Sequence, residues 1–83
     1  MNYHEALGLY TELKEAADAA RYRRAAFLNN LGVMARQAQE SPERSFDYAE
    51  ARALLEGAER ADAERAGLET RLQEAARVCG KRI

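Results

Sequence analysis

Apolar residues recur at alternating steps of three and four along two stretches of this chain, and this spacing constrains the fold more than any other feature. The first stretch runs from Tyr3 to Ala38, and the second from Ala51 to Cys79. Such spacing is typical of helices that pack side by side, each through one apolar stripe. The only proline, Pro42, lies between the two stretches. We therefore predict an all-α protein, an antiparallel two-helix hairpin that turns at the proline.

Local signals place the boundaries of the first helix and the turn. Asn2 and Glu5 have the spacing of a capping box, in which the two side chains satisfy backbone N–H groups at a helix start. The first helix is therefore expected over about residues 2–39. A serine followed by Pro42 favours a turn, which we expect over about residues 40–45.

The second helix is expected over about residues 46–79, within a single domain of residues 1–83. Gly80 is the expected C-cap, because glycine readily adopts the left-handed conformation that ends many helices. Lys81 and Arg82 would then lie at the negative end of the helix dipole.

A hairpin with this turn also predicts which residues face each other. Leu13 should face Leu72, and Phe27 should face Ala58, so that large side chains oppose small ones. The aromatic residues of the first stripe, Tyr3 and Tyr10 together with Phe27, are expected in the core between the helices.

The core of such a hairpin is too small to make a robustly stable protein by itself. Eighteen of the 83 residues are alanine, which favours helix but buries little area. Scaffolds of this size usually need a disulfide, a metal or a partner. One cysteine excludes an internal disulfide, and one histidine leaves no metal-ligand pattern. We therefore expect the hairpin to assemble into a four-helix bundle or a higher oligomer.

Several apolar side chains lie outside or beside the predicted seam, and a second buried surface would explain them. A further copy of the chain would supply that surface, and so would a helix or groove of a larger protein. The candidate partner-contact residues are Leu9, Leu28, Val33, Phe46, Tyr48 and Leu55.

The only cluster of basic residues suggests a second, different kind of site. Arg21 and Arg24 share one helical face, Arg23 points away from it, and Arg65 lies on the opposing stripe. Arg21, Arg24 and Arg65 are therefore candidate anion contacts for a nucleotide or a nucleic acid. The alternative is structural: Arg21 would face Glu64 and form an interhelical ion pair, as e and g residues do in coiled coils.

Charge and motifs exclude several classes of function. The formal net charge is −1, whereas a general nucleic-acid binder needs a basic surplus. The sequence has no apolar run of the length that spans a membrane and no signal peptide, so we expect a cytoplasmic protein. His4 and Cys79 meet at the open end of the hairpin, but no orienting third residue accompanies them. We expect no catalytic residue, cofactor or metal, and therefore no enzyme.

The sequence thus predicts a small interaction module that acts through apolar helix faces. It would be an adaptor, chaperone or inhibitor whose partners are itself and a larger protein. The high arginine-to-lysine ratio, eleven to two, indicates a GC-rich bacterial or phage genome. A nucleotide or nucleic-acid binder built on an oligomeric helical scaffold is the alternative.

Overall fold

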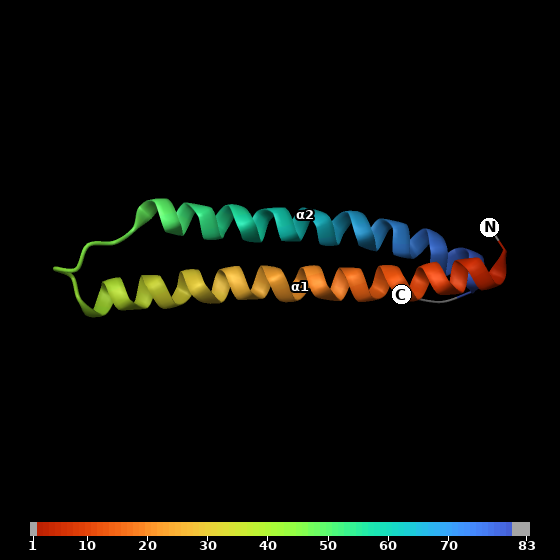
Figure 1. Ribbon diagram of the computed structural model, residues 1–83, viewed down its shortest axis with the longest axis horizontal. Coiled ribbons are helices and arrows are strands. Elements are labelled where there is room, and N and C mark those ends of the chain that lie inside the picture. Colours follow the sequence, from red (N-terminus) through yellow and green to blue (C-terminus); the bar gives the residue numbers. More distant parts are fainter. Residues whose placement is uncertain (1, 81–83) are drawn as a thin grey trace.

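The computed structural model describes residues 2–80, which form two long helices and no strand (Figure 1). Helix α1 spans Tyr3–Glu40 and helix α2 spans Tyr48–Cys79. They run in opposite directions from the loop and cross in projection near the termini in this view. The hairpin is 61 × 17 × 14 Å. The predicted all-α hairpin is confirmed, and the expectation for Lys81 and Arg82 lies outside the described residues.

The N-terminus of α1 has one half of the predicted capping box. The Glu5 backbone N–H donates to the Asn2 side-chain oxygen at 2.9 Å, which satisfies one group that the first helical turn leaves without a partner. The Glu5 carboxylate accepts from the Asn2 side-chain nitrogen at 3.2 Å rather than from a backbone N–H.

The loop extends further toward α2 than predicted. The Arg44 backbone N–H donates to the Ser41 carbonyl at 2.9 Å, which places Pro42 at the second position of a β-turn. Helix α2 begins at Tyr48 rather than at residue 46, because Asp47 is its N-cap and accepts the Glu50 backbone N–H at 2.9 Å. At the other end Gly80 caps α2 as predicted, with a φ of 72°.

The best-buried core lies in the half of the hairpin near the termini. Leu13, which is 4% exposed, packs with Leu72 and Ala75. The predicted opposition of Leu13 and Leu72 is therefore confirmed. Tyr10 packs partly buried against this cluster, but the expectation for Tyr3 is wrong: its ring is exposed and touches only the edge of the His4 ring among aromatic groups.

A single close contact fixes the register in the half near the loop. The half-buried Phe27 ring lies so close to Gly57 that a β-carbon added there would sit 2.7 Å from it. The predicted neighbour of Phe27 was Ala58, one residue further along. Glycine leaves room for the ring at this point, and a larger residue there would displace it.

Candidate functional site

Three of the six candidate partner-contact residues are exposed. Val33, Leu55 and Tyr48 are 41%, 53% and 66% exposed, whereas Leu28 is half-buried, as are Leu9 and Phe46. The core cluster near the termini includes none of the three exposed residues. They are therefore free to contact another chain.

Leu9 has a different environment from the one expected. Its side chain is half-buried against the core cluster of Leu13, Leu72 and Ala75. It lies four residues before Leu13, so it shares the inner face of α1. The expectation that Leu9 falls outside the seam is wrong, because an apolar stripe about 100° wide includes the residues that flank the heptad positions.

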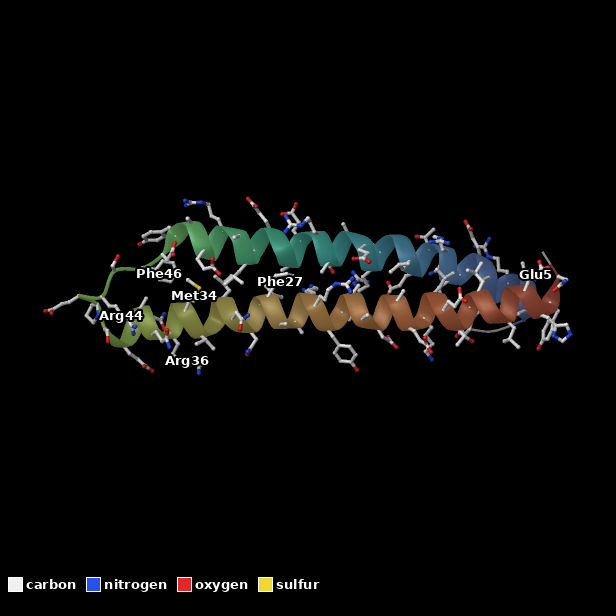
Figure 2. All side chains as sticks on the ribbon, viewed as in Figure 1. Glu5, Phe27, Met34, Arg36, Arg44 and Phe46 are labelled. Carbon is white, nitrogen blue, oxygen red and sulfur yellow. The ribbon has the colours of Figure 1, made fainter. Side chains whose placement is uncertain are left out.

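Phe46 and Tyr48 form an aromatic pair at the point where the loop enters α2. Their ring centroids lie 4.8 Å apart with an interplanar angle of 68°, an edge-to-face arrangement. Figure 2 shows Phe46 near Met34, which points from α1 toward α2, whereas Arg36 points away. We expected these two aromatic side chains on different helical faces, but Phe46 precedes the helix, so helical spacing does not apply to it.

The candidate anion contacts belong to a network of alternating charges at the middle of the hairpin. Arg24 reaches Asp62 at 3.3 Å, and Arg65 bonds to Asp62 at 2.9 Å and to Glu69 at 2.7 Å. Arg21 pairs with Glu69 and with Asp18. We call these six residues the central cluster: Asp18, Arg21, Arg24, Asp62, Arg65 and Glu69.

The central cluster is electrically balanced. Its three guanidinium groups meet three carboxylates, so the network as a whole is formally neutral. The hydrogen bond to Asp62, with the charge of Glu69, raises the pKa of Arg65 above its ordinary value. The raised pKa keeps Arg65 protonated throughout the physiological pH range, so the positive charge that its two carboxylate partners bind is retained there.

The predicted pair between Arg21 and Glu64 is wrong. Glu64 instead accepts from Arg23 at 2.6 Å, on the side of α1 away from the face that Arg21 and Arg24 share. The hairpin register gives the height of a residue along the axis but not the side of the hairpin on which it lies. Arg23 is 200° around α1 from Arg21, so its pair with Glu64 bridges the helices on the opposite side.

A surface hollow of about 460 Å³ lies over the central cluster, lined by Arg21, Arg24, Arg65 and Asp62. The structure therefore brings the three predicted anion contacts together. Each of the three also has a carboxylate partner within 3.5 Å.

Two exposed apolar side chains were missed by the sequence reasoning. Tyr22 is exposed on α1, and Val78 is exposed near the end of α2, where it lines a hollow with Leu9 and Arg71. Val78 lies seven residues after Arg71, and this heptad step was the signal that could have placed it on that surface. His4 is exposed and Cys79 is buried.

Comparison of the chain with protein-family models, with curated proteins and with solved structures found no match. Among the described residues, no helix is long and apolar enough to cross a membrane. A proposal about function must therefore start from the side chains that the hairpin leaves exposed and from the charges at its middle.

Proposed function

We propose that this chain is a small, non-enzymatic protein-interaction module that acts through its apolar helix faces. One observation carries the proposal: from Arg21 to Glu40, more than half of α1, no residue is buried. The large side chains of this segment, among them Phe27, Leu28 and Met34, all keep part of their surface exposed. A partner that covers them completes the core that two helices leave open.

The free energy available at this surface supports the proposal. Complete burial of a leucine side chain contributes about 1.5–3 kcal/mol, so half-buried leucines leave part of that gain to a partner. The occupant is either a further copy of the chain, which gives a four-helix bundle or higher oligomer, or a larger protein. In the second case the module is an adaptor, chaperone or inhibitor. The composition of the sequence leads us to expect this module in the cytoplasm of a bacterium or of a phage-infected cell.

The alternative function, nucleotide or nucleic-acid binding, is favoured by the hollow lined by three arginines. We rank it second because Asp18, Asp62 and Glu69 neutralise those arginines. An added phosphate would have to compete with carboxylates that are already in place. The chain as a whole offers no positive surplus to attract a polyanion.

Chemical cross-linking in a bacterial lysate tests the interaction module. We compare the tagged chain with Leu55→Glu and with the control Tyr22→Glu, since Tyr22 is also exposed but is not a candidate partner contact. Adducts with any protein, the chain itself included, should be lost in Leu55→Glu and kept in Tyr22→Glu. A chain that forms no adduct, or whose adducts do not depend on Leu55, contradicts the proposal.

The anion-binding alternative makes a separate prediction for Arg21→Ala. A structural role predicts a stability loss of up to about 1 kcal/mol in urea unfolding, because the pair is partly exposed. Calorimetric titration with ATP and with a short single-stranded DNA should then give no heat for the wild type. Measurable binding that Arg21→Ala abolishes, without loss of stability, would move this alternative ahead.

A further inference from the structure

The two sides of the hairpin carry different residues, and the interhelical ion pairs identify each side. Arg24–Asp62 and Arg21–Glu69 bridge the helices on one side. Leu28 follows Arg21 by seven residues, or two helical turns, so it lies on the same side of α1. Leu55 precedes Asp62 by the same interval on α2. We call this side the leucine flank.

Two heptad rows run along the leucine flank. Tyr10 and Lys14 line one hollow with Arg21 and Glu69, which confirms that these residues share a side. The row on α1 consists of Leu7, Lys14, Arg21, Leu28 and Ala35. The row on α2 consists of Tyr48, Leu55, Asp62, Glu69 and Ala76.

The opposite side, marked by Arg23–Glu64, is mostly polar where the leucine flank is apolar. The same heptad steps from Arg23 lead to Asn30 and Gln37, and from Glu64 they lead to Glu50 and Arg71. Its apolar members, Leu9 and Val78, are confined to the end near the termini. The leucine flank is therefore the better surface for a partner that covers the whole hairpin.

The surface area of the chain matches the needs of a dimer. The accessible surface is 6158 Å². A compact folded monomer of 9.3 kDa exposes about 5,000 Å², so this chain has an excess of about 1,200 Å². A standard interface takes about 800 Å² from each partner. The elongated hairpin therefore exposes more surface than a compact monomer, by more than one partner's share of a standard interface.

We propose that the leucine flank is the binding site for a second copy of this chain. The proposal rests on the interaction module proposed above and names its partner. The two-fold axis runs parallel to the long axis of the hairpin, so both loops lie at the same end. Helix α1 of each chain then packs on α2 of the other, and every neighbouring pair in the resulting four-helix bundle is antiparallel.

The charges of the two rows select this arrangement. With the axis along the hairpin, Arg21 meets the partner's Asp62, and Lys14 meets the partner's Glu69. Leu28 meets the partner's Leu55 in the same register. Cations therefore face anions and leucine faces leucine along the interface, which is the self-complementarity that a two-fold interface requires.

The other face-to-face arrangement has its two-fold axis across the hairpin and reverses one chain. It packs each row on its own copy. When the two chains overlap over their full length, Arg21 meets the partner's Arg21, Asp62 meets the partner's Asp62, and Leu28 meets the partner's Lys14. Like charges in register and a lysine against a leucine oppose this arrangement.

Light scattering of the purified chain over a dilution series is the first test. We expect the mass of two chains at micromolar concentration. Leu55→Glu should weaken the dimer at least about 30-fold, the loss typical of a residue that dominates an interface, whereas Tyr22→Glu, outside the leucine flank, should not. Helix content by circular dichroism checks that both variants fold.

A folded wild-type chain that scatters as a monomer at 100 µM or more would overturn the dimer. So would equal weakening by the two variants. If a monomeric chain still forms Leu55-dependent adducts in the lysate, the interaction module stands and only the second copy is wrong. If both experiments fail, the interaction module is wrong as well.

A mixing experiment tests the arrangement. Leu28→Glu and Leu55→Lys should each be monomeric alone, because each puts two charges against leucines. Mixed in equal amounts they should form a heterodimer, since one glutamate then meets one lysine and the other contact is leucine on leucine. Absence of the heterodimer would overturn the arrangement.

Spin labels give an independent distance. We place one label at position 45 by Ser45→Cys in a Cys79→Ala background and measure the distance between the two labels of a dimer. Labels at the same end of the bundle support the axis along the hairpin. A separation near the 61 Å length of the hairpin would show that one chain is reversed.

Discussion

The half of the hairpin near the termini and the half near the loop place different side chains between the same two helices. Near the termini, α1 buries mostly alanines, and Leu13 fits against Leu72 and Ala75. Near the loop, α1 contributes Phe27, Leu31 and Met34, which are larger and yet only half-buried. Larger apolar residues have therefore not produced a better-buried core.

The difference follows from how much of a side chain two packed helices can cover. Small side chains let the backbones approach closely, so a single leucine between them is covered from both sides. The bulkier side chains of α1 near the loop extend beyond the seam, and one facing helix leaves part of their surface open, as it does for Phe27, Leu31 and Met34. Alanine suits a two-helix seam, whereas a seam of large residues needs a third layer.

The largest effect that tests this comparison is the truncation of one leucine in each half. Leu13→Ala should destabilise the fold by roughly 3 kcal/mol, because Leu13 is fully buried. Leu31→Ala should cost only about 1 kcal/mol in dilute solution, since Leu31 is half-buried. Urea unfolding, at protein concentrations too low for association, measures both stability losses. Equal losses would remove the distinction between the two halves of the hairpin.

A glycine pair sharpens the comparison at a smaller scale. Gly67→Ala should stabilise the protein by about 1 kcal/mol, because alanine favours helix and no atom lies within 4 Å of the new β-carbon. Gly57→Ala gains the same propensity but displaces the Phe27 ring, so it should fall short of Gly67→Ala by about 1–3 kcal/mol. Thermal melts of the two variants measure the difference in stability. Equal stabilisation would show that the Phe27 ring moves freely.

The smallest effect is expected for the ion pair on the polar side. Arg23→Gln removes the bond to Glu64, in which both side chains are about half exposed. The loss should be at most about 0.5 kcal/mol at low salt and should vanish at 1 M salt. A larger or salt-independent loss would mean that charges, and not packing, hold the middle of the hairpin together.

The sequence predicted those parts of the fold that depend on local chemistry or on helical period. The cap at Asn2, the cap at Gly80 and the apposition of Leu13 and Leu72 follow from residue type and spacing. The start of α2 could not be predicted from residue type and spacing. Pro42 and Asp47 are both suited to a helix start, and the path of the loop decides between them.

The charged contacts were predictable in kind but not in pairing. The sequence correctly indicated that Arg24 and Arg65 need acidic partners, and Asp62 serves both. Long side chains reach over several residues, so height along the axis alone does not choose between Glu64 and Glu69 for Arg21. Exposure of Tyr3 was missed because the stripe extends beyond the point where the helices bury aromatic rings.

The contact between Phe27 and Gly57 has a consequence for the uniqueness of the fold. Displacement of α2 by one helical turn would bring Leu54 or Ala61 to the Phe27 ring in place of Gly57, and the side chain of either residue would occupy the space that the ring now fills. The glycine therefore favours the observed alignment of the helices over its neighbours.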